Sequence, residues 1–105
     1  MENRRSFYRF LPPFLKDQYF SREGNGPRER CVVFNISRKG VGLKFHTAEN
    51  INVGSIIHLE MFVPRESESV NIKGILKWFE KWEGDFSGGI ELTEVLDDST
   101  WAKLF

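Results

Sequence analysis

Hydrophobic and polar residues alternate along most of the chain in short runs that predict β-strands. The clearest run covers residues 40–45, where Val41, Leu43 and Phe45 share one face with a period of two. Other runs are bounded by glycine, proline or polar turn residues, and these are expected to form strands at 14–20, 30–36, 56–63, 70–82 and 86–95. The run 70–82 is long for one strand, so we expect it to bend near Gly74 or to contain a β-bulge.

One short helical pattern follows the last expected strand. Asp97 and Asp98 are typical N-cap residues, and Trp101, Leu104 and Phe105 follow at spacings that place them on one helical face. That face could cover an open end of a barrel. Strands at this spacing, without a longer helical period, predict an all-β fold: a small six-stranded antiparallel barrel with a short C-terminal helix.

The composition fits one ordinary globular domain. The chain has 105 residues, 40% of them hydrophobic, and its ten Phe and three Trp supply a core without a metal or disulfides. Cys31 is the only cysteine, which rules out an internal disulfide, and its apolar neighbours predict a small buried hydrophobic side chain.

The amino-terminal segment differs from the rest. Residues 1–12 carry arginines but no clean apolar period, and the prolines at 12 and 13 disfavour a helix, so we expect a flexible arm followed by one barrel domain at 13–105. No signal peptide is recognisable, and no run approaches the roughly 20 apolar residues of a membrane span. These features predict a cytoplasmic protein without membrane insertion.

Charge is balanced overall but uneven along the chain. Fifteen basic and fifteen acidic residues give a formal net charge of zero, which disfavours a general DNA or RNA binder. Three arginines nevertheless gather in the arm, and a second basic group is expected from Arg28, Arg30, Arg38 and Lys39. Local cationic patches on a neutral protein suit a small anion better than a polymer.

Two clusters carry the candidate chemistry. Arg5 and Arg9 are four residues apart in the arm, and Asn35, Ser37 and Gly40 form an N-x-S-x-x-G pattern at an expected strand-to-strand turn. Guanidinium groups bind phosphate oxygens, or the O6/N7 edge of guanine, through paired hydrogen bonds. Short polar side chains beside a glycine suit another edge of a base that approaches the backbone. Together the clusters predict a pocket for an anionic guanine nucleotide.

The segment RSFYR at 5–9, followed by NISRKG at 35–40, resembles the R-x-x-x-R and D/N-x-S-x-x-G motif pair of PilZ domains, bacterial receptors for the second messenger cyclic di-GMP. The resemblance extends over nearly the whole chain, because the family's barrel is about this long. It implies a PilZ-type split barrel and a cyclic di-GMP ligand, with no other cofactor. The ligand-binding residues it implies are Arg4, Arg5, Arg9, Asn35, Ser37 and Gly40.

Several of these positions have a second interpretation. An arginine at position 4 favours a stacked pair of nucleotides in the family, although it can equally be an exposed charge. Asn35 replaces the more usual aspartate, so one acceptor is kept and a bidentate contact is lost. Ser37 and Asn35 can also bond their own backbone. Gly40 either adopts a conformation closed to other residues or allows close approach of a ligand, and Arg38 can be solvated or contact a phosphate.

The remaining chemistry-bearing residues predict no catalysis. His46 and His58 have no spaced partners, so no metal site is expected, and no paired carboxylates or nucleophile motif suggest an enzyme. Trp78 and Trp82 can pack on the barrel or stack on a base.

The sequence therefore predicts a cyclic di-GMP receptor that orders its arginine-rich arm on binding and signals to a downstream protein partner. An adaptor of the same fold that has lost nucleotide binding is the main alternative. A small barrel that binds single-stranded RNA is a weaker one, disfavoured by the zero net charge.

Overall fold

The computed structural model describes residues 11–22, 26–46 and 51–105. The predicted flexible arm, with Arg4, Arg5 and Arg9, lies outside these ranges except for Leu11 and Pro12. The side chain of Trp82 also lies outside the description.

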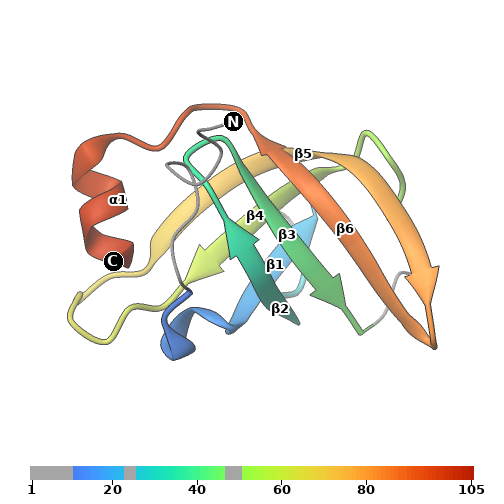
Figure 1. The fold of residues 1–105 in the computed structure, drawn as a ribbon, viewed down its shortest axis with the longest axis horizontal. Coiled ribbons are helices and arrows are strands. Elements are labelled where there is room, and N and C mark those ends of the chain that lie inside the picture. Colours follow the sequence, from blue (N-terminus) through green and yellow to red (C-terminus); the bar gives the residue numbers. More distant parts are fainter. Residues whose placement is uncertain (1–10, 23–25, 47–50) are drawn as a thin grey trace, which may run out of the picture.

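Six antiparallel strands form a closed barrel in the order β1-β2-β3-β6-β5-β4, with β4 pairing back onto β1 (Figure 1). The strands are β1 (Asp17–Arg22), β2 (Glu29–Ile36), β3 (Gly40–Phe45), β4 (Ile56–Met61), β5 (Val70–Trp82) and β6 (Asp85–Leu92). Helix α1 (Asp98–Leu104) follows at one end of the barrel. This architecture confirms the predicted six-stranded antiparallel barrel with a short C-terminal helix.

Three strands, β1, β4 and β6, have a boundary that differs from the predicted one by two residues or more. The first strand does not include Phe14, because the 3-10 helix η2 (Pro13–Leu15) precedes it and Pro13 has the fixed φ that starts such a turn. The fourth strand ends at Met61, since the Phe62 N–H donates to a side chain instead of to a strand. The sixth ends at Leu92, after which the chain turns toward α1.

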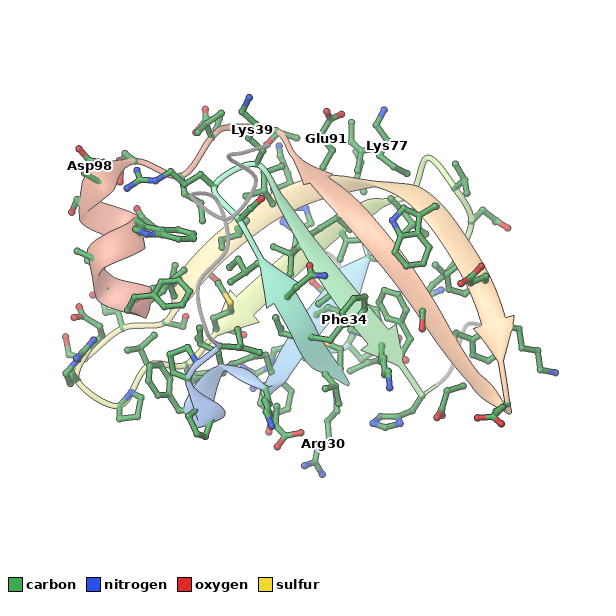
Figure 2. All side chains as sticks on the ribbon, viewed as in Figure 1. Arg30, Phe34, Lys39, Lys77, Glu91 and Asp98 are labelled. Atoms are coloured by element: carbon green, nitrogen blue, oxygen red, sulfur yellow. The ribbon has the colours of Figure 1, made fainter. Side chains whose placement is uncertain are left out.

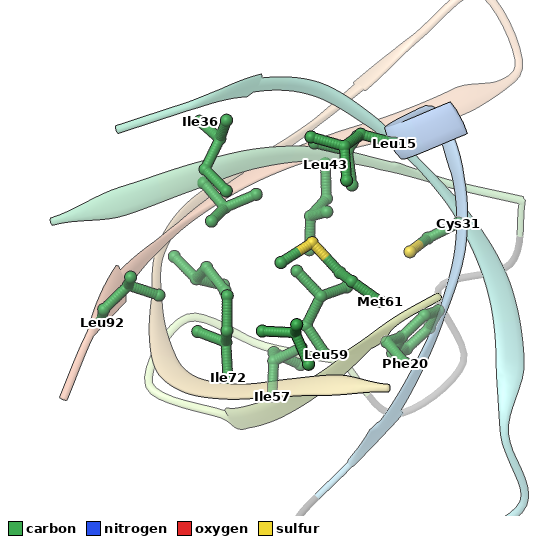
Figure 3. Close-up of a cluster of buried hydrophobic side chains, with 14 of the residues drawn as sticks. Leu15, Phe20, Cys31, Ile36, Leu43, Ile57, Leu59, Met61, Ile72 and Leu92 are labelled. Atoms are coloured by element: carbon green, nitrogen blue, oxygen red, sulfur yellow. The ribbon is translucent and has the colours of Figure 1, made fainter. Parts of the chain in front are cut away.

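The barrel interior contains the predicted apolar face. Val41, Leu43 and Phe45 are all buried, as their period of two predicts. Figure 3 shows the side chains of Leu43 and Met61, with Cys31, inside the ring of strands. Cys31 is 1% exposed, which confirms its expected role as a small buried side chain.

Helix α1 begins at a capped terminus. The Asp97 carboxylate accepts a hydrogen bond from Thr100 N at 2.7 Å, and the hydrogen bonds from Thr100 lower the pKa of Asp97. Trp101 and Leu104 are buried, and the Phe105 ring lies 4.6 Å from the Trp101 ring between centroids. The predicted helix and its apolar face are confirmed.

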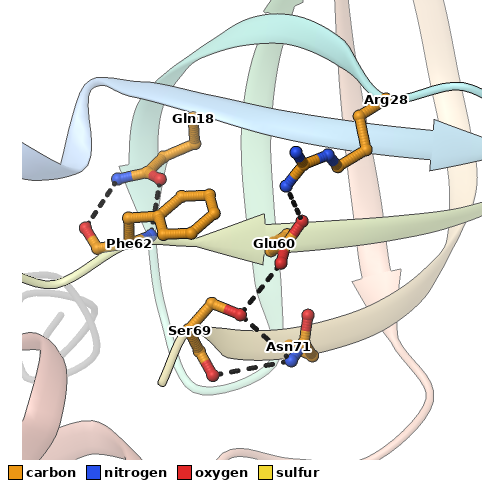
Figure 4. Close-up of polar contacts among 6 residues, drawn as sticks. All are labelled: Gln18, Arg28, Glu60, Phe62, Ser69 and Asn71. Atoms are coloured by element: carbon orange, nitrogen blue, oxygen red, sulfur yellow. Dashed lines mark hydrogen bonds and ion pairs between the residues drawn. The ribbon is translucent and has the colours of Figure 1, made fainter. Parts of the chain in front are cut away.

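A buried polar side chain joins the start of β1 to the end of β4. Gln18 is 2% exposed; its Nε2 donates to Phe14 O (2.9 Å), and its Oε1 accepts from Phe62 N (2.8 Å). Figure 4 shows this amide beside a second contact, in which Arg28 donates to Glu60 at 2.8 Å. The Gln18 amide thus satisfies backbone groups where the β1–β4 ladder ends.

Among the helices of the described ranges, none combines the length and apolar character needed to cross a membrane.

Candidate functional site

The turn between β2 and β3 is held by the side chain of Ser37. Its Oγ accepts hydrogen bonds from Lys39 N (3.2 Å) and Gly40 N (3.1 Å), while Ser37 N donates to Gly40 O (2.8 Å). Ser37 is 8% exposed. The turn role considered for Ser37 is therefore confirmed, and contact with a ligand stays a prediction.

The Asn35 side chain also forms a hydrogen bond with the backbone, but its partner lies on the neighbouring strand β3. Its Oδ1 accepts from Gly42 N at 3.1 Å, and the residue is exposed on the outer face of the barrel. Because a carbonyl oxygen has two lone pairs, one acceptor position remains. Within the described part of the chain, the Asn35 NH₂ group forms no hydrogen bond, so it can still donate to a ligand.

Gly40 is required for close packing and not for an unusual backbone conformation. Positive φ among the described glycines occurs at Gly54 and Gly84, so the expected special conformation at Gly40 is wrong. A Cβ at Gly40 would instead lie 2.9 Å from Ile90 O on β6. The missing side chain therefore lets two strands approach beneath the turn.

Two β-bulges flank a pair of outward-facing glycines. In the sheet, Asn35 lies opposite Gly42, Gly42 opposite Gly89, and Gly89 opposite Trp78, so the row crosses β2, β3, β6 and β5. The bulge in β2 leaves the consecutive residues Phe34 and Asn35 both exposed.

The bulge in β5 likewise leaves the consecutive residues Lys77 and Trp78 both exposed. The bulge expected in the long strand 70–82 is thus confirmed, and the register places it between Leu76 and Trp78. Each bulge supplies one aromatic and one polar side chain beside a glycine.

A hollow of about 300 Å³ opens on the outer face over this row. Its lining includes all three described residues of the predicted site, Asn35, Ser37 and Gly40. The other lining residues come from β3, β5, β6 and the turn: Lys39, Val41, Gly42, Lys77, Trp78, Gly89, Ile90 and Glu91. Figure 2 shows Lys39, Glu91 and Lys77 along one edge of the barrel, and Lys77 pairs with Glu91 at 3.5 Å.

The expected second basic group is wrong as a single patch, because its members point to different partners. Arg28 pairs with Glu60, an interaction that raises the pKa of Arg28 and lowers that of Glu60. Arg30 projects from the far end of β2 (Figure 2). Arg38 donates to Asp98 Oδ1 at 2.7 Å. Among the described residues Lys39 forms no ion pair, and it borders the hollow.

Arg38 connects the turn to helix α1. Besides Asp98, its guanidinium donates to Leu96 O (3.3 Å) and lies 5.2 Å from the centre of the Trp101 ring. The backbone adds a further bond, from Leu96 N to Arg38 O at 2.9 Å. Arg38 is thus a partly exposed charge that is bonded to the helix segment, and contact with a phosphate stays a prediction.

The chain enters the barrel beside the middle of β2. Val33 N donates to Lys16 O at 2.7 Å, and Asp17 lies opposite Val32. Lys16 therefore lies next to Val33, and Leu11 packs against the core.

Several lining residues were missed by sequence reasoning. Gly42 follows Gly40 with a period of two, which would have placed it on the same face. Lys77 and Glu91 had no such signal, because their position at the hollow depends on strand pairing and on a bulge.

Across the described ranges 11–22, 26–46 and 51–105, no three His, Cys, Asp or Glu side chains gather in a group that could hold a metal ion. Cys31 is not a reactive group of the site, because burial, and secondarily the charge of Asp17, raises the pKa of its thiol to about 12.

Comparison with known proteins identifies the family. The model of the PilZ domain matches residues 3–104, so the chain belongs to the PilZ domain family. Domains of this family are of the cyclic di-GMP-receptor and adaptor type, and they are typically binding modules without enzymatic activity.

A solved structure, the Bacillus subtilis inhibitor of motility MotI/DgrA, has the same fold, with a TM-score of 0.68 and 18% sequence identity. The match covers 98% of this chain and 49% of that one, so the chain spans about half the length of this neighbour. A search of curated proteins found no match.

Proposed function

We propose that this chain is a bacterial, cytoplasmic receptor for cyclic di-GMP, which it binds between its amino-terminal arginines and the hollow beside the β2–β3 turn. The observation that carries the proposal is that Asn35, Ser37 and Gly40 line one hollow on the outer face of the barrel. The ligand presents two phosphates and two guanines, which require cationic donors and polar contacts to a base edge.

The Asn35 amide suits one guanine edge. The free lone pair of Oδ1 can accept from guanine N1–H or N2–H₂, while the NH₂ group can donate to an acceptor of the ligand. An aspartate would offer two acceptors, so this contact is weaker than in a family member that carries aspartate. Ser37 acts mainly by holding the turn in which Asn35 and Gly40 are presented.

The arginines supply the phosphate contacts. Arg9 lies two residues before Leu11, and Leu11 packs against the core of the barrel. The proposal requires the arm to carry Arg5 and Arg9 from there to the hollow. Three arginines close together repel one another, and two phosphates would neutralise them. Binding would order the arm against the turn, and a downstream protein partner would recognise the combined surface.

Calorimetric titration of the chain with cyclic di-GMP tests the proposal. Arg5→Ala or Arg9→Ala should weaken binding at least about tenfold, since a charge-assisted hydrogen bond contributes roughly 1.5–3 kcal/mol. Circular dichroism should show an unchanged fold in both variants, because neither residue belongs to the described core.

Arg30→Ala is the matched control, because it removes a positive charge at the opposite end of β2 from the turn. It should leave the affinity unchanged. GTP should compete far more weakly than cyclic di-GMP, since it offers one guanine only. Equal competition by GTP, or equal affinity in all variants, would remove the proposed site.

An adaptor that has lost nucleotide binding is the alternative, and the engaged Oδ1 of Asn35 favours it. Thermal denaturation separates the two functions. A ligand that binds only the folded state must raise the midpoint of thermal unfolding. A cyclic di-GMP concentration of 100 times the dissociation constant should therefore add about 2.7 kcal/mol to the free energy of unfolding. An unchanged midpoint at millimolar cyclic di-GMP would favour the adaptor.

A further inference from the structure

The outer face of β1 and β4 carries aromatic side chains on strands that do not line the hollow of the proposed site. Strand pairing places Tyr19 opposite Arg30 on β2 and opposite Glu60 on β4, so the three side chains share the outer face. Phe62 follows the end of β4, and its ring meets the Tyr19 ring edge to face, with the centroids 5.7 Å apart. Phe62 remains 45% exposed, so a large apolar surface of this aromatic pair is accessible to solvent.

Contacts on two sides hold the aromatic pair in place. On the core side, the buried Gln18 amide accepts a hydrogen bond from Phe62 N at 2.8 Å. On the solvent side, the Arg28 guanidinium lies 5.5 Å from the centre of the Tyr19 ring and 6.0 Å from that of Phe62. Glu60 in turn holds this guanidinium through the 2.8 Å contact drawn in Figure 4. Little freedom remains to be lost on binding, so this surface is preorganised for a partner.

A second hollow, of about 430 Å³, lies beside the aromatic pair. Arg28 and Glu60, which contact the pair, form part of its lining. Ser21, His58 and Lys73 also line it, and they lie in one row across β1, β4 and β5. The hollow therefore provides space for side chains of a partner next to the exposed Phe62 ring.

Positive charge predominates around the aromatic pair. Glu60 is already paired with Arg28, whereas Arg30 and Lys73 form no ion pair with any residue of the described ranges. Asp17 lies further along β1, opposite Val32, and limits the cationic area on that side. Two unpaired cations around a carboxylate are too few to follow a nucleic-acid backbone, and they complement acidic side chains of a protein.

The residue types are also those of protein interfaces. Aromatic residues and arginine are enriched where proteins bind one another, and tyrosine and arginine are enriched among the residues that contribute most to affinity. We name this surface the β1–β4 face, and its residues are Tyr19, Arg28, Arg30, Glu60, Phe62 and Lys73.

We propose that the β1–β4 face is a docking surface for an acidic segment of a partner protein. An apolar side chain of that segment packs on Phe62, and its carboxylates pair with Arg30 and Lys73. The inference goes beyond the proposed function, because the surface is complete without cyclic di-GMP. The partner is therefore bound in both ligand states, and the ordered arm supplies a separate contact.

Selection from a random peptide library displayed on phage, against the immobilised full chain without cyclic di-GMP, tests the proposal. Enriched peptides should combine aspartate or glutamate with a large apolar residue. In calorimetry with the most enriched peptide, Phe62→Ala should weaken binding at least about tenfold, as expected for a central interface residue. This variant keeps the backbone N–H that Gln18 binds, so its fold should be retained. Phe34→Ala is the matched control, since Phe34 is 39% exposed on β2 outside the β1–β4 face, and it should bind like the wild type.

Charge reversal provides a second readout that a purely structural role would not change. The combined variant Arg30→Glu and Lys73→Glu should lose the acidic peptide and bind its lysine-substituted counterpart better than the wild type does. Failure to enrich acidic peptides, or equal peptide affinity in the wild type, Phe62→Ala and the charge-reversed variant, would overturn the docking surface. Cyclic di-GMP affinity should be unchanged in all these variants, because none of the substituted residues lines the hollow of the proposed site. A wild type that binds the peptide but not cyclic di-GMP would overturn the proposed function alone.

Discussion

At the scale of single residues, the polar side chain of Gln18 shows how the barrel closes. It lies in the core with 2% exposure, and both atoms of its amide have backbone partners on η2 or beyond the end of β4. The composition of the first strand did not predict this role, because a glutamine in an alternating run is expected on the outer face. Its burial depends on a strand end more than 40 residues away in sequence.

Replacing Gln18 should be costly for stability. Gln18→Ala leaves Phe62 N and Phe14 O without their side-chain partner in a partly buried position, so we expect a loss of about 1–3 kcal/mol in the free energy of unfolding. Urea denaturation of the wild type and the variant measures this loss in the free energy of unfolding. Ser69→Ala is a suitable control, since it removes a polar contact at the less buried neighbouring cluster, and a Gln18 variant as stable as this control would contradict the account.

Cys31 provides a prediction on pH. Because burial raises the pKa of its thiol from 9.0 to about 12, the folded protein should hold the unreactive protonated form at pH 8. The stability linked to this thiol is full below pH 9.0 and is lost as pH rises toward 12. A thiol reagent at pH 8 should therefore modify Cys31 slowly in buffer and rapidly in denaturant; equal rates would show an accessible thiolate.

At the scale of elements, the alternation of hydrophobic and polar residues, together with the turn residues, predicted where the strands lie. Such local sequence patterns do not predict how the strands pack on one another. The strand Gly40–Phe45 and the capped helix α1 depend on residues that are close to one another in sequence, so both were predicted well. The η2 turn was missed because the whole segment Phe14–Phe20 was interpreted as one loose strand. The exact bulge positions depend on packing between strands, which a single run of residues does not encode.

The Arg38 link between the turn and α1 gives a prediction at this scale. Arg38→Ala removes a hydrogen bond to Leu96 O and the contact with the Trp101 ring, so it should lower the free energy of unfolding by about 1–2 kcal/mol. Asp98→Ala removes only the exposed partner, whose side chain is 97% accessible, and should cost less than about 1 kcal/mol. Thermal denaturation of both variants distinguishes them, and the reverse order would show that the ion pair is the main contact.

At the scale of the whole molecule, the candidate site combines segments that are distant in sequence. The motif residues Asn35, Ser37 and Gly40 were predicted as a cluster, and the structure brings them to one hollow. Of the opposite wall, Trp78 was considered from sequence as a packing or base-stacking residue. Lys77 was not, because no local pattern reveals that β5 pairs with β6 beside β3. The prediction of a second basic group was wrong for the same reason, because its members form ion pairs with different residues that are distant in sequence.

The glycines of the barrel provide the most direct measurement. In amide NMR spectra of the wild-type chain titrated with cyclic di-GMP, we expect saturable shifts at Gly40, Gly42 and Gly89, which line the hollow. Gly84, in the turn between β5 and β6, should not move and serves as the internal reference. Unchanged signals at the first three glycines with saturating ligand, or a larger shift at Gly84, would contradict binding of cyclic di-GMP at this hollow.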